Sequence, residues 1–289
     1  MDASYLSVLC VPGDHGGPPL AFAGDRAGEK LLNGKLLLEG RQVGEVVDGI
    51  ASFVEKPVDW PPEEIERLRT AGQIERNWQN EIWHAGNTPT RGAFCDELAA
   101  VDGIILELAA GPGGGSMPPM LNRNPSARVV VNDVSLAILQ LWGEFLRKRE
   151  VGPQLCLAAF NATSIPIRSG AVAAVSGSLA LSSIGGLSIF AETRRVLGRG
   201  GAVYSQEMIV DSADWARMPE ERRLYWEEAM PGLTKGAARL LEQAGLEVES
   251  CEILPGRELD PDEGGLPRDA ADHGVTLRIV WEYVKARKR

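Results

Sequence analysis

The sequence lacks any apolar run close to the roughly 20 residues that a membrane-spanning helix needs. Its opening residues, MDASYLSVLC, also lack the basic flank and the long apolar core of a signal peptide. Only four cysteines are present, with no CxxC pair, which argues against a disulfide framework and against a closed zinc site. These absences predict a folded cytoplasmic protein with no metal and no membrane partner.

Basic residues are also in short supply, with 30 Lys and Arg against 40 Asp and Glu, for a net charge of −10. This balance disfavours a large nucleic-acid footprint, although a local basic patch remains compatible with it. A small-molecule substrate is therefore favoured over RNA as the partner. The charge says nothing about the oligomeric state.

The 289 residues, 44% of them hydrophobic, suffice for one large domain and one small domain. Residues 1–58 consist of short apolar pieces separated by glycine-rich turns, a pattern that predicts a small β-rich unit. A proline-rich connector from Lys56 to Pro62 marks the boundary. We therefore expect a second domain over residues 59–289.

A glycine-rich stretch between Ile104 and Asp133 is the strongest functional signal. An apolar run ends at Glu107 and is followed by a turn with Gly111 and Gly113, which predicts a strand, a ligand-binding loop and a helix. The next apolar run ends at Asp133, about twenty residues later, where an acidic side chain can meet a ribose hydroxyl. A tight strand-to-helix turn would need glycines as well, so this cluster alone is a weak signal.

The remaining pattern alternates strands and helices, which predicts a doubly wound parallel sheet of the α/β class. The final strand follows a long loop and should pair antiparallel inside that sheet. The expected strands are 154–160, 172–176, 202–208, 246–254 and 275–284, and the expected helices are 136–147, 187–197 and 233–244.

A helical pattern begins at Glu63, just ahead of the glycine-rich stretch. Trp78 and Trp83 on this segment are interpreted as packing residues, and the segment is placed to cover the ligand pocket. His84, one of three histidines, follows in a loop. It is a candidate acid or base, but a solvated loop residue is the favoured interpretation.

Residues 100–285 resemble a class I S-adenosylmethionine-dependent methyltransferase. Glu107 to Gly113 fits the acidic-xxx-Gly-x-Gly first motif, and Asp133 fits the acidic residue that closes the second strand. Asn161-Ala162 falls where the family has an Asp-Ala pair beside the adenine, and Gly200-Gly201 closes its E…RVLxxGG segment. Each motif is weak by itself, but their order and spacing together are specific.

The resemblance implies a Rossmann-like, mostly parallel seven-stranded sheet with S-adenosylmethionine as cofactor. Glu107 would lie near the methionine amino group, the glycines would admit the cofactor, and Asp133 would accept hydrogen bonds from the ribose hydroxyls. Asn161 replaces the usual aspartate, but its amide oxygen can still accept from the adenine amino group. The implied cofactor-binding set is Glu107, Ala109, Gly111, Gly113, Asp133, Val134, Asn161, Ala162 and Ser176.

The first 50 residues resemble a degenerate zinc-ribbon-like domain, that of the tRNA-methyltransferase activator subunit. Cys10, the His15-Gly16-Gly17 element and Asp48-Gly49-Ile50 match parts of its pattern, but the second cysteine pair is missing. A four-ligand zinc site therefore cannot form as in those relatives.

The catalytic residue remains unassigned. Positioning alone can supply much of the rate acceleration, and a base is needed only when the acceptor must lose a proton early. Candidates near the pocket mouth are His84, Ser176, Ser178, Gln206 and Glu207.

The leading hypothesis is methyl transfer to a small or medium-sized acceptor. The alternatives are a methyltransferase-shaped binding or regulatory protein without catalysis, an RNA methyltransferase, and a nicotinamide-dependent dehydrogenase. The last is disfavoured because Ser116 stands where a GxGxxG loop has its third glycine.

Overall fold

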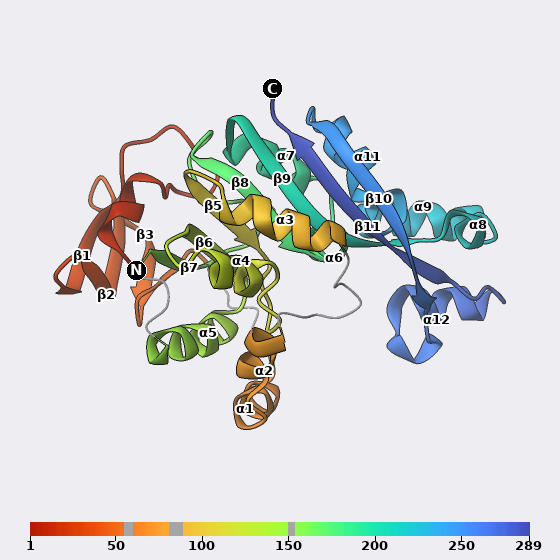
Figure 1. Ribbon diagram of the computed structural model, residues 1–289, viewed down its shortest axis with the longest axis horizontal. Helices are drawn as coiled ribbons and strands as arrows, with labels where there is room; N and C mark the ends of the chain where they lie inside the picture. The colour runs from red at the N-terminus through yellow and green to blue at the C-terminus, as the bar shows by residue number, and fades with distance from the viewer. Residues whose placement is uncertain (55–59, 81–88, 150–153) are drawn as a thin grey trace.

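A mixed sheet, whose strands run in the order β1-β2-β3-β4-β7-β6-β5-β8-β9-β11-β10, forms the centre of the molecule (Figure 1). The computed structural model describes residues 1–54, 60–80, 89–149 and 154–289. The strands are β1 (Ala21–Ala27), β2 (Lys30–Leu38), β3 (Arg41–Val47), β4 (Ile50–Ser52), β5 (Ile104–Leu108), β6 (Arg128–Asp133), β7 (Leu155–Ala159), β8 (Val172–Ser178), β9 (Leu197–Val210), β10 (Glu247–Glu258) and β11 (Arg278–Arg287).

Helices cover both faces of the central strands (Figure 1). They are α1 (Pro62–Thr70), α2 (Gln73–Asn80), α3 (Pro89–Ala99), α4 (Met117–Arg123), α5 (Leu136–Lys148), α6 (Ala180–Ser183), α7 (Ser188–Val196), α8 (Ser212–Trp215), α9 (Glu220–Ala229), α10 (Pro231–Lys235), α11 (Ala237–Gln243) and α12 (Gly265–Asp272), with 3-10 turns η1 (Ala3–Ser7) and η3 (Pro261–Glu263). In the described part of the chain, no helix is long and apolar enough to cross a membrane.

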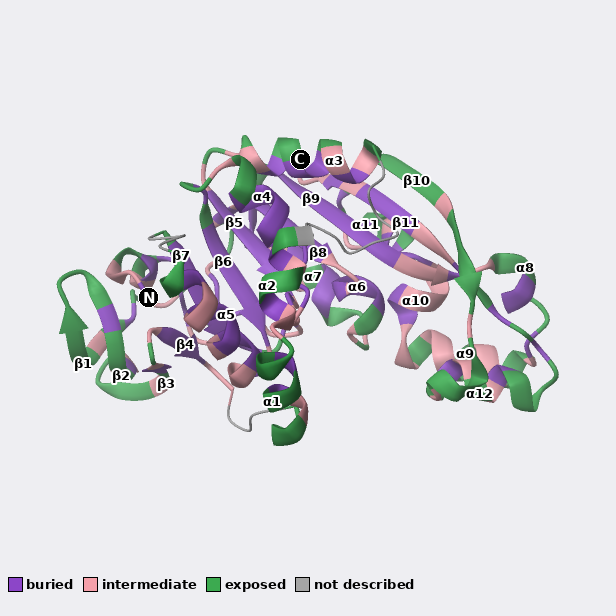
Figure 2. Ribbon diagram, turned by 60° about the horizontal axis from the view of Figure 1, so that its bottom comes forward, coloured by how far each residue is buried: buried purple, intermediate pink, exposed green. Residues whose placement is uncertain are grey.

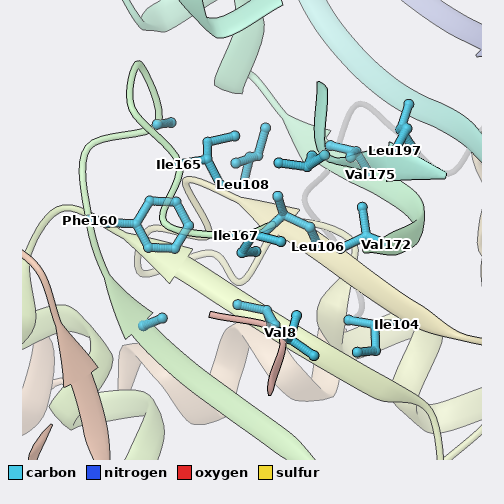
Figure 3. Close-up of a cluster of buried hydrophobic side chains, with 14 of the residues drawn as sticks. Val8, Ile104, Leu106, Leu108, Phe160, Ile165, Ile167, Val172, Val175 and Leu197 are labelled. Carbon is cyan, nitrogen blue, oxygen red and sulfur yellow. The ribbon is translucent and has the colours of Figure 1, made fainter. Parts of the chain in front are cut away.

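The core lies in two layers, one on each side of the central strands. On β5, Leu106 and Leu108 face the cluster that Figure 3 shows, whereas Ile105 faces the opposite cluster beneath α4 and α5. Side chains alternate between the two faces of a strand, so a strand covered on both sides must be apolar throughout. Figure 2 shows the central strands buried, while β1 and α1 at the periphery are largely exposed.

The prediction of parallel central strands is confirmed. Strand β5 pairs in parallel with β6 and with β8, and β6 and β8 pair in parallel with β7 and β9. Counted from β5, these strands follow the doubly wound order 3-2-1-4-5. Strand β11 then lies antiparallel between β9 and β10, as expected for a final strand that returns into the sheet.

The prediction of a mostly parallel seven-stranded sheet is wrong in its strand number and its share of parallel pairs. The described residues form eleven strands, because the antiparallel strands β1 to β4 continue the same sheet. The junction is a parallel pair in which Ala51 and Ser52 of β4 face Ala158 and Ala159 of β7. This pairing covers the edge of β7, whose backbone groups would otherwise remain open.

The N-terminal strands do not bear out the zinc-ribbon resemblance. Cys10 and His15 approach each other, with 3.9 Å between Sγ and Nδ1, but no metal-holding group of three His, Cys, Asp or Glu side chains exists among the described residues. The proposed boundary between residues 58 and 59 lies within the segment 55–59, outside the described residues. The division into two domains stays a prediction.

Most predicted helices and strands are present, with shifted ends near the C-terminus. Helix α5 is capped by Ser135, whose hydroxyl accepts from the Ile138 N–H, and carries basic residues in its last turn. The helix predicted over 233–244 is interrupted at Gly236, which has φ +83°. The final strand begins at Arg278, because Val275 and Leu277 pack instead in a separate cluster beneath α12.

Candidate functional site

The strand order reverses at β5, which lies between β6 and β8, so the carboxyl end of β5 is a topological switch point. The glycine-rich turn of residues 109–116 emerges there and leads into α4. Gly111, Gly114 and Gly115 all have positive φ, and so does Ala109, at +47°. A left-handed conformation is uncommon for alanine and marks local backbone strain of the kind found at ligand sites.

Glu107 lies beneath this turn and is fully buried. Its Oε1 accepts from the Ser116 N–H at 3.0 Å, and its Oε2 accepts from the Ser176 hydroxyl on β8. A Cβ at position 115 would lie 1.9 Å from Oε1, so only glycine leaves room for the carboxylate. Burial raises the pKa of Glu107 to about 7, against the opposing effect of these hydrogen bonds.

Asp133 at the end of β6 joins the glycine-rich turn from the other side. Its Oδ2 accepts from the Gly111 N–H at 2.8 Å, and its Oδ1 accepts from the Ser135 N–H at 2.8 Å. Burial raises the pKa of Asp133, although the backbone hydrogen bonds favour its charged form. The structure therefore brings together Glu107, Gly111, Asp133 and Ser176 of the predicted set.

Asn132 is a structural member of this site that the sequence analysis missed. Its Oδ1 accepts from the Ala109 N–H at 3.2 Å, and its Nδ2 donates to the Phe160 carbonyl at 2.9 Å. The side chain thus ties together the carboxyl ends of β5 and β7 from its place on β6. The sequence signal that could have identified it is the apolar run Val129 to Val131, which is followed directly by the amide side chain of Asn132.

Arg91 of α3 is a second residue that the sequence analysis missed. Its side chain is buried, and Nη2 donates to the Gly115 carbonyl at 3.3 Å. The positive charge lowers the pKa of Glu107, though by less than burial raises it. Arg91 therefore places a cation beside the glycine-rich turn, on the side where Glu107 lies.

Two side-chain hydrogen bonds, one from a tryptophan and one from an asparagine, support the turn from neighbouring helices. Trp142 of α5 donates its Nε1–H to the Gly111 carbonyl at 2.8 Å, and Asn77 of α2 donates to the Pro112 carbonyl at 2.8 Å. Trp78 is buried and packs against Phe145 with 5.4 Å between ring centroids, which confirms its interpretation as a packing residue. Trp83 lies outside the described residues.

Val134 and Asn161 lie at a cavity of about 860 Å³ beside the carboxyl ends of β6 and β7. Asn161 is exposed, and its Oδ1 accepts from the backbone N–H of Thr163 at 2.9 Å and from its hydroxyl at 2.8 Å. Ala162 is buried. Glu107 and Ser176 do not line this cavity, so the predicted set forms two neighbouring groups around the end of β6.

The candidate acid and base residues have structural partners. Glu207 of β9 is fully buried and accepts from the Ser182 N–H at 2.8 Å and the Ser182 hydroxyl at 2.7 Å. It also accepts from the Leu181 N–H and the Ser205 hydroxyl, and burial raises its pKa to about 7. Glu207 thus caps α6 and fixes the segment that follows β8.

Of the other candidates, Ser178 lies at the carboxyl end of β8, Gln206 lies on β9, and His84 lies outside the described residues. Ser178 is partly exposed at the end of β8. Gln206 is buried, and its backbone carbonyl accepts from the N–H of Leu179, whose φ is +66°.

No family model and no curated protein matches the sequence. Solved structures do match. A provisionally assigned methyltransferase from Bacillus halodurans C-125 has a TM-score of 0.51 and 18% identity, with 68% of this chain and 98% of that chain covered. The chain has the class I methyltransferase fold.

Two further solved structures agree with this fold. The MccD protein has a TM-score of 0.52 and 13% identity, with 70% of this chain and 97% of that chain covered. The [4+2]-cyclase SpnF has a TM-score of 0.51 and 15% identity, with 81% of this chain and 99% of that chain covered. Because one neighbour is a cyclase, the fold alone does not specify methyl transfer.

Proposed function

We propose that this protein is an S-adenosylmethionine-dependent methyltransferase acting on a small or medium-sized acceptor. The observation that carries the proposal is the arrangement of Glu107 and Asp133 around one glycine-rich turn at the switch point of the sheet. Open α/β sheets bind their ligands in this crevice. The class I fold supports the same reading.

The residues present suit the chemistry of that cofactor. Glu107 offers a buried carboxylate to a methionine ammonium, and Asp133 faces the turn where a ribose would lie. Both Asp133 oxygens already accept a backbone N–H, but each carboxylate oxygen has capacity for a further donor, such as a ribose hydroxyl. S-adenosylmethionine would supply an electrophilic methyl group, and the chain would position it.

We assign the remaining predicted residues to roles around the same cofactor. Ala109, Gly111 and Gly113 would allow its close approach, and Ser176 would hold Glu107 in place. Val134, Asn161 and Ala162 would surround the adenine. Asn161 would have to release or share its contact with Thr163, because that turn already uses its amide oxygen.

A non-catalytic binding protein of the same shape is the second candidate. The position of Glu207 favours it, because both carboxylate oxygens accept hydrogen bonds from residues of α6. This candidate base is therefore engaged in a structural role. A nicotinamide-dependent dehydrogenase is not favoured, because β11 separates β9 from β10, unlike the order 3-2-1-4-5-6 of the dinucleotide fold.

Calorimetry with S-adenosylhomocysteine and with NAD tests the cofactor. We expect S-adenosylhomocysteine to bind and NAD not to bind, and NAD binding alone would overturn the proposal. Radiolabelled methyl transfer into metabolite and RNA pools then tests catalysis. Label in a metabolite fraction would support a small acceptor, label in RNA would reassign the acceptor, and binding without transfer would favour the non-catalytic protein.

A further inference from the structure

The cavity beside Val134 and Asn161 lies where one strand of the sheet stops short. Pairing between β3 and β4 ends at Glu45 and Ser52, whereas β3 continues to Arg41. Within the described residues, the stretch of β3 from Arg41 to Gly44 thus has a strand partner only on its β2 side. Its other edge faces the cavity, and no strand of the described residues pairs with the backbone groups there.

Phe53 forms an apolar wall of this cavity. Its backbone N–H donates to the Ala159 carbonyl of β7 at 2.9 Å, which fixes the residue beside the end of that strand. Its ring lies against Gly44, where a Cβ would be 3.0 Å from Cδ1 of the ring. A Cβ there would also lie 2.8 Å from the Ser52 carbonyl oxygen, so the glycine leaves room for both the ring and the backbone beside it.

The opposite wall comes from the ends of β6 and β7. Val134, Phe160 and Asn161 line the cavity there, and Val134 follows directly after Asp133. The cavity therefore extends from the N-terminal strands to the residue that directly follows Asp133. The volume, about 860 Å³, lies within the range of pockets that bind small molecules.

The charge and polarity of the residues that line the cavity indicate which class of ligand it can bind. Arg41 and Glu45 both line the cavity, so it has no excess of positive charge for a phosphate. An apolar wall from Phe53 and Val43 combined with an open backbone edge suits a flat ring that carries donors and acceptors on its rim. A heteroaromatic base has this chemistry, and an aliphatic chain does not.

We propose that β3 and the segment Ser52–Val54 form the outer wall of the nucleobase subsite, with Phe53 packing against the base. This inference rests on the proposed cofactor and extends it, because it makes the N-terminal strands part of the binding site. The backbone edge of β3 from Arg41 to Gly44 faces the rim of the base. The N-terminal strands then contribute to ligand specificity, in addition to covering the edge of β7.

Titration calorimetry with S-adenosylhomocysteine and with adenosine tests this wall. Phe53→Ala should weaken binding of both ligands about tenfold or more, since aromatic packing against a base is typically worth that much. Phe22→Ala is the matched control, because Phe22 is likewise half-buried in the N-terminal strands but does not line the cavity. It should leave both affinities within about twofold.

A second variant keeps the test independent of core packing. Gln42 is exposed on β3 and lines the cavity, so Gln42→Trp should obstruct the subsite without altering the core, whereas Gln42→Ala should not. Unchanged affinity in both Phe53→Ala and Gln42→Trp, in a wild-type protein that binds S-adenosylhomocysteine, would overturn the inference and leave the proposed function standing. Failure of the wild type to bind would instead remove the proposed function.

Discussion

Glu107 and Ser176 face each other across β5 and β8, and the Ser176 hydroxyl donates to Oε2 of the Glu107 carboxylate. Both side chains are fully buried. The contact therefore spans the position at which the strand order reverses, directly beneath the glycine-rich turn. It holds a carboxyl group with a pKa of about 7 at the centre of the candidate site.

Ser176→Ala should raise the pKa of Glu107 further, because the lost hydrogen bond favours the charged carboxylate. If Glu107 meets the ammonium of the cofactor, affinity for S-adenosylhomocysteine rises with pH as this carboxyl ionises. The midpoint of that rise should move upward, and affinity near pH 7 should fall about two- to tenfold. Calorimetry between pH 6 and pH 9 measures both changes.

Ser178→Ala is the matched control for this prediction. Ser178 lies two residues further along β8, on the same face, whereas the hydroxyl that donates to Glu107 belongs to Ser176. Its pH profile should match that of the wild type. A profile for Ser176→Ala that also matches the wild type would contradict the assigned role of Glu107.

Asp133→Asn should weaken S-adenosylhomocysteine binding by about 1–3 kcal/mol, because one acceptor oxygen for the ribose is replaced by a donor amide. The new amide also faces the N–H of Gly111 or Ser135, so the melting temperature should fall. Asp102→Asn, exposed just before β5, is the control for the charge change. Equal affinity in wild type and Asp133→Asn would refute the ribose contact.

Gly115→Ala should destabilise the protein and abolish cofactor binding. The new Cβ would lie 1.9 Å from Glu107 Oε1, and φ of +56° is unfavourable for alanine. Gly92→Ala is the opposite case, since this helical glycine of α3 has no atom near the added Cβ. It should be neutral or stabilise by up to about 1 kcal/mol. Urea unfolding of both variants compares these effects, and equal stabilities would contradict the close packing at Gly115.

Glu207 should make the protein less stable as pH rises from about 5 to 7. Its folded pKa, about 7, lies above its ordinary value of 4.5, so the folded state binds the extra proton. Its stabilising contribution is complete below the ordinary value and is lost as pH rises through the folded pKa. The free energy of unfolding should fall by up to about 1.4 kcal/mol per pH unit for this carboxyl.

Urea unfolding across this pH range measures the slope. Glu207→Gln should flatten it, while Glu107 contributes a similar dependence in both proteins. Glu263→Gln is the control, because its ion pair with Arg257 and the Asp260 N–H lower its pKa to about 2, outside this window. An unchanged slope in Glu207→Gln would show that Glu207 does not carry a proton at neutral pH.

The sequence by itself determined the centre of the fold. Short apolar runs bounded by glycine and by acidic residues predict β5, β6 and the turn between them, because the signals for strand, turn and helix are local. The same local pattern located Glu107 and Asp133 at adjacent strand ends. The antiparallel return of the last strand was expected from the long loop that precedes it.

Tertiary structure alone decided how the distant parts meet. The pairing of Ser52 with Ala159, which turns an expected seven-stranded sheet into one of eleven, depends on two strand edges more than 100 residues apart. Asn132 and Glu207 looked like an ordinary strand residue and a candidate base, yet both satisfy buried backbone groups of other segments. No local pattern specifies such partners, because hydrogen-bonding groups are matched only when packing removes water from them.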